Sequence, residues 1–411
     1  ALLSLAPASI VWRSSGSGHL LARRTHLLAR QNSETTAPPS VLAATISRAK
    51  AFAAVLVAAV TRAADDTCAM AVLRVDPLTF PFDTDSPFLF GVFHNDKYPK
   101  GNAKMGPDAS LRGHNIGADF GNPAGWSMYH GEGGIPGFPK HPHRGFETIS
   151  VSVRGFVDHV DSLGAAGRFG DGDVQWMTAG AGISHAEMFP CLARAEENHM
   201  EFFQIWLNLP RAKKMSPPNF LMFWGEDIPT LDRGGALVKL VAGAAEGFNK
   251  PALPPPPDSY ARDPNSQLLV MTIKLKPGAS YVIPGAPGAG RDTHRNLYKY
   301  EGGELTVGGK RLTATHRIKV DASKDLEVTA GAQEIGLLVL QGNDLNEPVV
   351  QHGPFVGNTR EDITKAFRDY QMTQFGSWPW PSDGVVHKRD DQRFAKYPDG
   401  RVETKPRRAT P

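Results

Sequence analysis

The sequence predicts an all-β fold built from two β-barrels in one chain. Turn formers are abundant, with 42 Gly and 33 Pro among 411 residues, and this composition favours short strands over long helices. β-branched residues gather in short runs, several of which alternate apolar and polar side chains with the period of two that is typical of strands. The chain is longer than the about 100–200 residues of one domain, so we expect two domains with additional tails.

Residues 1–69 form a leader that differs in composition from the rest of the chain. Ala, Ser, Leu and Arg dominate it, and Glu34 is its only acid before Asp65. This composition resembles an organellar transit peptide, which would imply a plastid or mitochondrial protein. Alternatively, translation starts at Met70, the leader is upstream read-through, and the protein is cytoplasmic or nuclear. The apolar run at 51–60 is about half the roughly 20 residues that cross a bilayer, so no membrane span is expected.

Charge and cysteine content exclude some classes of function. The net charge is +3 at neutral pH, which gives no strong field for nucleic acid or an anionic membrane, so we expect no direct binding to either. The two cysteines, Cys68 and Cys191, lie far apart. A structural disulfide is therefore not expected, and a reducing compartment is permitted.

We place the first domain at residues 70–230. Its apolar and alternating runs predict strands at 86–93, 148–153, 156–161, 174–177 and 202–207. The polar, glycine-rich segment at 94–133 is too long for an ordinary connection and is interpreted as a loop that covers the functional site.

Two pairs of potential metal ligands lie in this domain, on what we expect to be neighbouring strands. His141 and His143 form the first pair, and His185 and Glu187 form the second. Residues two apart in a strand face the same side, so each pair can bind one ion. A single His-x-His is more often two unrelated histidines, but the second pair favours a metal site. Three imidazoles and a carboxylate suit a six-coordinate first-row metal with open positions, whereas structural zinc sites more often contain thiolates.

Three further polar residues are candidates to support these ligands. Gln204 interrupts an apolar strand, where it either supports the site or is a hydrogen-bonded core amide. His159 lies on the strand at 156–161. Glu147 is four residues after His143, and strand parity puts both on one face, so parity alone leaves Glu147 and Glu187 as alternative ligands.

We place the second domain at residues 231–376. Short runs separated by Gly and Pro predict strands at 237–242, 268–275, 280–283, 297–300, 304–307 and 336–340, which indicate a second barrel. Histidines occur there only singly, at His294, His316 and His352, so this barrel is predicted to bind no metal. The proline-rich segment 251–264 is expected to be an extended surface loop or part of an interdomain connection.

The last part of the chain is predicted to contain one helix and a mobile tail. Residues 359–362 resemble a capping box, and Ile363, Ala366, Phe367 and Tyr370 follow with helical spacing. We expect this helix to pack on a barrel. Residues 377–411 are rich in charge and lack apolar periodicity, so they are predicted to be mobile.

Several of these segments carry a resemblance to a known family. The sequence is similar to the pirin family of the cupin superfamily at 141–148, 172–180, 185–188, 204–209, 351–356 and 358–361. The resemblance covers about residues 85–376. The chain departs from shorter members by its leader, by the long segment before the first ligand pair, and by Ala181, where many members carry Arg.

The resemblance implies a bicupin, in which two double-stranded β-helix (jelly-roll) barrels are followed by a C-terminal helix. It implies one iron per chain in the N-terminal barrel, held by His141, His143, His185 and Glu187, with other divalent first-row metals as alternatives. It also implies a quercetin 2,3-dioxygenase type of activity on a flavonol-like aromatic substrate and O₂. The alternative is a non-enzymatic, iron-dependent redox sensor or transcriptional coregulator with a protein partner.

The resemblance also favours Glu187 over Glu147 as the metal-binding carboxylate. Glu187 is two residues after His185 on the same backbone segment, whereas Arg144 and Gly145 can turn the chain before Glu147. We therefore expect Glu147 to support the ligands by hydrogen bonding or by pairing with a cation. Glu187 is also the candidate catalytic base, because a carboxylate on the metal in a dry pocket can accept the proton of a substrate hydroxyl.

Overall fold

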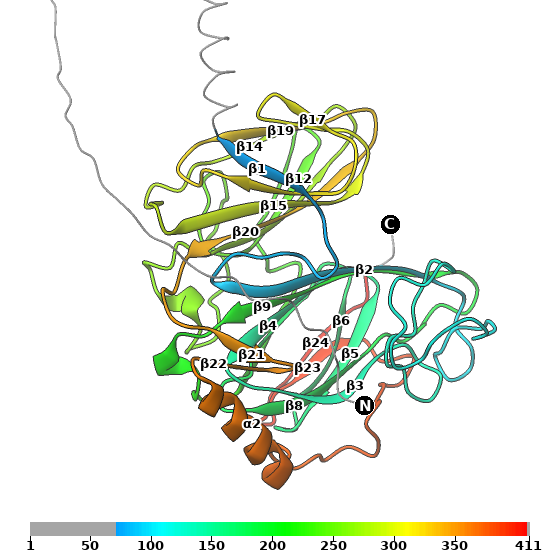
Figure 1. Ribbon diagram of the computed structural model, residues 1–411. Helices are drawn as coiled ribbons and strands as arrows, with labels where there is room; N and C mark the ends of the chain where they lie inside the picture. Colours follow the sequence, from blue (N-terminus) through cyan, green and yellow to red (C-terminus); the bar gives the residue numbers. More distant parts are fainter. Residues whose placement is uncertain (1–70, 409–411) are drawn as a thin grey trace, which may run out of the picture. The chain divides into compact units, whose positions relative to one another are not determined.

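The computed structural model describes residues 71–408, which contain two β-barrels, each built from two facing sheets (Figure 1). The leader at 1–69 lies outside the described residues. Within the described range, no helix combines the length and the apolar character that a membrane crossing needs.

The first barrel consists of a five-stranded and a six-stranded sheet. The five-stranded sheet has the order β10 (Asn219–Phe223), β7 (Val174–Thr178), β4 (Phe146–Arg154), β9 (Asn198–Asn208) and β2 (Phe88–Tyr98). The six-stranded sheet has the order β24 (Val402–Lys405), β23 (Arg393–Lys396), β6 (Ala166–Gly170), β5 (Phe156–Asp161), β8 (Ile183–Met188) and β3 (Gly137–His143). Within the described residues, neighbouring strands of these sheets pair antiparallel, and both predicted ligand pairs lie in the six-stranded sheet.

The second barrel consists of a seven-stranded and a four-stranded sheet. The seven-stranded sheet has the order β1 (Val72–Pro77), β18 (His316–Val320), β15 (Thr293–Gly302), β20 (Ile335–Asn343), β13 (Leu269–Leu275), β12 (Ala236–Ala242) and β11 (Thr230–Arg233). The four-stranded sheet has the order β14 (Ser280–Ile283), β19 (Leu326–Ala330), β16 (Leu305–Val307) and β17 (Lys310–Leu312). Aliphatic side chains from both sheets fill the interior of this barrel.

A second apolar core joins the two barrels. Ile149 and Val151 of β4 and Trp176 of β7 pack in one cluster with Leu338 and Leu340 of β20. Because side chains alternate along a strand, the opposite face of β4 carries Thr148, Ser150 and Ser152, which point into the first barrel. The alternation in β4 thus separates an apolar interface from a polar barrel interior.

Two segments, β1 and the hairpin at 350–357, cross the domain boundaries that we predicted. β1 pairs with β18 and so belongs to the second barrel, although it lies within residues 70–230. Conversely, the hairpin of β21 (Val350–His352) and β22 (Phe355–Gly357) contacts the first barrel, where the backbone nitrogen of Arg144 donates to Pro354 O and that of Val356 donates to Arg144 O. The order of the strands in the sequence could not reveal that these segments pack on the other barrel, because each placement depends on contacts between distant segments.

Helix α2 (Arg360–Thr373) is the single α-helix among residues 71–408. Thr359 caps it by accepting from the backbone of Asp362, whose carboxylate accepts from the Thr359 backbone, so the predicted capping box is present. The helix buries Ile363 and Ala366 against Phe355 and Phe375. Arg144 Nη1 donates to Asp369 Oδ2 over 2.7 Å, which fastens the helix to the first barrel.

The structure contradicts the prediction of a mobile tail for residues 377–408. In that segment β23 pairs with β6, and β24 pairs with β23 (red in Figure 1). Trp378, Trp380, Val385 and Phe394 pack on an apolar cluster formed by β5, β6 and β8. Charged side chains of this segment also form ion pairs with the barrel: Arg393 Nη1 donates to Asp173 Oδ1 over 2.6 Å. Charges that look solvated in the sequence are therefore paired.

Ser259 and Tyr260, in the proline-rich segment at 251–264, lie between the two barrels. The segment includes the short 3₁₀ helix η2 (Tyr260–Arg262), whereas η1 (Arg211–Lys213) follows β9. Tyr260 packs in the core that joins the barrels, and Ser259 contacts Glu147 of the first barrel. The segment thus helps to fix one barrel on the other.

Candidate metal centre

The register of β3 and β8 brings the two predicted ligand pairs together. His141 and His185 are directly opposite each other in this antiparallel pair. The ring centroids of His141, His143 and His185 lie 4.4 to 4.9 Å apart. One nitrogen from each ring lies within 4.8 Å of the others, a spacing at which three imidazoles can hold one ion. The expectation that the pairs lie on neighbouring strands is confirmed.

The histidine nitrogens are available for a metal. Both ring nitrogens of His143 and of His185 are buried and have no hydrogen-bond partner among the described residues. His141 Nδ1 lies 2.8 Å from Pro139 O, to which it donates, and its Nε2 is left as the ligand atom. Unpartnered buried polar atoms are costly, so this arrangement fits a bound cation that would satisfy them.

Burial also keeps these histidines in the neutral form that binds metals. It lowers the pKa of His141 to about 4, and it lowers the pKa values of His143 and His185 well below the usual range. The neighbouring histidines add to this effect, since each protonated ring would repel the others. The three imidazoles therefore need no deprotonation near neutral pH before they bind an ion.

Glu187 lies in the same buried region, where two polar side chains orient it. Ser150 Oγ donates to Glu187 Oε1 over 2.9 Å, and Gln204 Nε2 donates to Oε2. Burial raises the pKa of Glu187, although nearby His159 and the two hydrogen bonds oppose the increase. Gln204 is thus a support for the candidate ligand rather than an isolated core amide.

His159 lies close enough to His185 and Glu187 to bind the same ion. Its ring, together with His185 and Glu187, offers three ligand atoms within 4.8 Å of one another. Nε2 of His159 lies 3.3 Å from Asp161 Oδ2, and its Nδ1 has no partner among residues 71–408. The ring stacks on Phe220 at 5.1 Å. His159 is therefore a second candidate for direct contact with an ion at this end of the cluster.

Glu147 does not support the site, contrary to our expectation. It is fully buried on the opposite face of β4 from Ser150, and its carboxylate accepts hydrogen bonds from Thr178 Oγ1 and Ser259 Oγ. Parity failed because β3 ends at His143 and β4 begins at Phe146, with Gly145 at φ +88° between them. That turn resets the alternation, so Glu147 faces the second barrel.

The sequence argument missed two residues near the candidate ligands, Ser150, which donates to Glu187, and Asp161, which contacts His159. Ser150 was not singled out, although the alternation of Thr148, Ser150 and Ser152 signals a polar face on β4. Asp161 was also missed; it lies two residues after His159 and is fully buried. Buried acids near histidines commonly orient the imidazole, so the spacing of these two residues was the available signal.

Aromatic side chains surround the histidines and limit access to them. Phe146 and Trp206 lie 5.1 and 5.2 Å from the ring of His143. On the other side, the centroids of Phe138 and His141 are 6.3 Å apart. Phe120 of the long segment at 94–133 contacts Phe138 in turn, at 6.4 Å. The segment therefore reaches the aromatic shell around the site.

Comparisons with known proteins agree with this organisation. The Pirin family model matches residues 109–207, and the model of the Pirin C-terminal cupin domain matches residues 270–376. The human protein Pirin is 34% identical over 252 residues, which are 60% of this chain and 80% of the human one. A Pseudomonas aeruginosa protein provisionally named a quercetin 2,3-dioxygenase is 38% identical over 244 residues, which are 58% of this chain and 79% of that protein.

A solved structure shows the same architecture. The crystal structure of quercetin 2,3-dioxygenase from Acinetobacter baumannii matches with a TM-score of 0.56 and 26% identity, and the match covers 75% of this chain and 98% of the other. The fold is accordingly an all-β bicupin, as predicted. With both cupin models matched and relatives above 30% identity over most of their length, the chain belongs to the pirin family.

Proposed function

We propose that this protein is an iron-dependent dioxygenase that acts on a flavonol-like substrate. The observation that carries the proposal is the cluster of His141, His143 and His185, whose ligand atoms lie within 4.8 Å of one another, while His185 also lies within 4.8 Å of Glu187 and His159. The likeness to the Acinetobacter baumannii enzyme supports the reaction class. When bound, a redox-active metal would supply the Lewis acidity and electron transfer that the reaction of a flavonol with O₂ needs.

The proposed ligands are His141, His143, His185 and Glu187, one ion being bound per chain. Three neutral imidazoles and one carboxylate leave positions open on a six-coordinate ion. Iron fits this mixed nitrogen and oxygen set, and other divalent first-row metals share the preference.

Glu187 is proposed to act as the base that takes the proton from the substrate hydroxyl. A carboxylate beside the metal in a dry pocket is well placed to accept the proton of a substrate hydroxyl. Ser150 and Gln204 each occupy one lone pair on the two carboxylate oxygens, and each oxygen retains a second lone pair that can accept a proton. These two residues therefore hold the base in position without blocking it.

The surrounding aromatic side chains are proposed to select a flat substrate and to exclude water. Phe138, Phe146 and Trp206 border the histidines, and aromatic rings favour stacked or edge contacts with a planar aromatic ligand. A site shielded from water would also strengthen the electrostatic effect of Glu187 on the bound substrate.

The test is oxygen uptake by iron-loaded protein with quercetin and other catechol-like compounds. We expect turnover by the natural sequence and a loss of at least about 100-fold in Glu187→Gln, the usual size of a general-base effect. Glu147→Gln is the matched control, because Glu147 faces the other barrel, and it should retain turnover. If the iron-loaded protein consumes no oxygen with any of these compounds, the proposal is wrong.

A further inference from the structure

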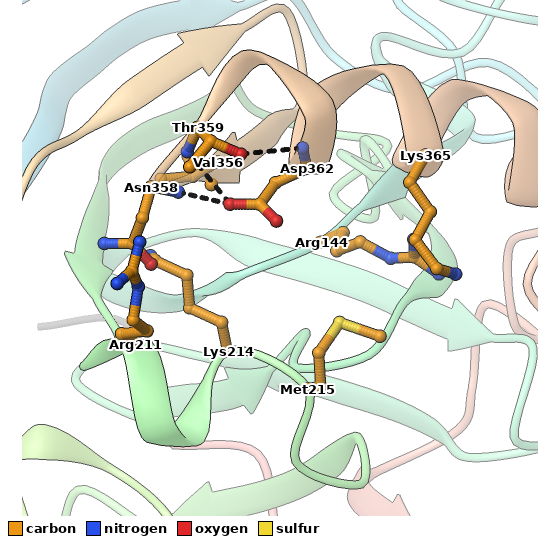
Figure 2. Close-up of a pocket in the computed structure, with 10 residues that line it drawn as sticks. Arg144, Arg211, Lys214, Met215, Val356, Asn358, Thr359, Asp362 and Lys365 are labelled. Atoms are coloured by element: carbon orange, nitrogen blue, oxygen red, sulfur yellow. Dashed lines mark hydrogen bonds between the residues drawn. The ribbon is translucent and has the colours of Figure 1, made fainter.

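A surface cavity of about 340 Å³ lies beside the start of α2 (Figure 2), and none of the clustered histidines lines it. Four cationic side chains line it, contributed by the β3–β4 turn, the loop after β9, and α2: Arg144, Arg211, Lys214 and Lys365. Among the residues that line the cavity, Asp362 is the one carboxylate. The lining thus carries an excess of positive charge.

Two of the four cations already have a counterion. Asp369 accepts from Arg144 Nη1 over 2.7 Å and from Lys365 Nζ over 2.5 Å. Asp362 Oδ2 accepts from the two backbone amides at the start of α2, each over 2.9 Å, so it serves as the helix cap. Because the capping box uses these amides, the charge of the cavity comes from side chains rather than from the helix end.

The other two cations, Arg211 and Lys214, form no salt bridge among residues 71–408. The nearby Glu347 carboxylate accepts from the backbone nitrogen of Arg211 over 2.7 Å, and it also lies 3.3 Å from Asn358 Nδ2. The guanidinium of Arg211 is exposed at the cavity. Figure 2 shows Lys214 extending from its loop toward Asn358 and the start of the helix. Neither cation has a carboxylate in direct salt-bridge contact within this range, although Glu347 and Asp362 lie near enough to Lys214 to attract its charge.

Lys214 is a buried cation whose hydrogen bonds are incomplete. It is 6% exposed, and its ammonium donates to Gly145 O over 3.0 Å and to Asn208 Oδ1 over 2.6 Å. An ammonium has three N–H donors, so one is left over. Asn208 is itself 1% exposed, and its Nδ2 has no partner within the described residues. Asn208 does not line the cavity, so the site rests on Lys214, whose buried charge and remaining donor are costly unless an anion satisfies them.

We propose that this cavity binds a phosphate group, held between Arg211 and Lys214. A phosphate would give Arg211 and Lys214 the direct anionic partner that they lack, and its oxygens can accept from the guanidinium fork and from the remaining ammonium donor from different directions. A planar carboxylate has one charge and two oxygens, so it matches these donors less well. The phosphate can be inorganic phosphate or the end of a small phosphomonoester, since both present the same group.

Calorimetric titration of the metal-loaded protein tests the proposal, with inorganic phosphate and glycerol phosphate as separate probes. We expect binding to weaken at least about tenfold in Arg211→Gln and in Lys214→Met, because each removes a charge-assisted hydrogen bond. Methionine preserves the packing of the buried stem of Lys214. Arg233→Gln is the control, because Arg233 is an exposed arginine on β11 outside the cavity, and it should leave binding within about twofold of the natural value.

Each possible result either supports or contradicts the proposed phosphate site. Tighter binding of glycerol phosphate indicates an ester ligand, and tighter binding of inorganic phosphate indicates the free ion; both support the site. Absence of binding at about 10 mM of either probe overturns it. If both cavity variants bind phosphate as tightly as the natural protein, the phosphate binds at the metal or elsewhere and the proposal is wrong. If Arg233→Gln loses as much affinity as the cavity variants, the binding reflects only the overall positive charge, and the proposal is also wrong. Because Arg211 is exposed, its variant keeps the test valid even if Lys214→Met folds poorly.

Discussion

Ser150 and Glu187 meet inside the first barrel, where the serine hydroxyl donates to the carboxylate over 2.9 Å. Glu147, three residues earlier on the same strand, turns its carboxylate to the opposite face and contacts Ser259. One strand thus separates two buried glutamates into different environments, one beside the histidines and one between the barrels.

Substitution of these two glutamates should separate their roles. Glu187→Gln is expected to weaken metal binding by at least about 100-fold, since it removes an anionic ligand, whereas Glu147→Gln should change it by less than about threefold. Metal affinity by competition with a chelator and the spectroscopic signature of the bound metal provide the measurement. A loss of metal in Glu147→Gln, with none in Glu187→Gln, would reverse the assignment.

Metal content should be one transition-metal ion per chain. The histidine cluster lies in the first barrel, and His294, His316 and His352 are not among the groups of described residues that could hold an ion. His143→Ala should reduce affinity by more than about 100-fold while the barrel, held by its apolar core, stays folded. Elemental analysis and circular dichroism test both points. Two ions per chain, or global unfolding of the variant, would contradict this.

Stability should depend on pH through Glu147. Burial raises the pKa of this carboxyl to about 7, above its usual value of 4.5. The folded state therefore binds the proton more tightly than the unfolded state, and the stabilisation is complete below pH 4.5 and is lost as the pH rises through about 7. The effect is at most a few kcal/mol, because one pKa unit is about 1.4 kcal/mol.

Glu147→Gln tests this dependence because it removes the titrating group and keeps the shape. Between pH 5 and pH 8, the free energy of unfolding of the natural protein should fall more steeply than that of the variant. Urea unfolding at the two pH values measures the difference. Parallel pH profiles would show that Glu147 titrates normally in the folded protein.

Deletion of residues 377–411 should destabilise the first barrel strongly. The fully buried Arg168 pairs with Asp158 at 2.6 Å and also donates to Lys388 O over 2.7 Å, so deletion would expose this ion pair and leave donors unmatched. We expect a loss of more than about 4 kcal/mol and a fall in Tm of at least about 10 °C. The matched deletion is a chain that starts at Met70, which should keep both Tm and metal content. Equal stability of the tail-deleted chain would contradict the role of the tail.

Local patterns made much of this structure predictable. The ligand pairs, the strand at 156–161 and the capping box from Thr359 to Asp362 each depend on residues within a few positions of one another. Sequence spacing reports such features directly, because strand alternation and helix capping are short-range effects.

Features that depend on distant contacts were not predictable. The face of Glu147 depends on Gly145, where a Cβ would lie 2.0 Å from Val356 O of a segment about 200 residues away. Similarly, the order of the tail depends on Asp173, which pairs with Arg393. In both cases, the partner that decides the local conformation lies outside any window of neighbouring residues.

The contact of Trp380 with the first barrel bears on when this barrel acquires its last contacts during synthesis. Trp380 Nε1 donates to Asp161 O over 2.7 Å, and the adjacent backbone of His387 donates to Asp158 over 2.8 Å. A ribosome synthesises these residues after β5, the strand that they contact. These two hydrogen bonds therefore form only after the chain has been synthesised past residue 387, and a chain terminated before Trp380 would lack both of them.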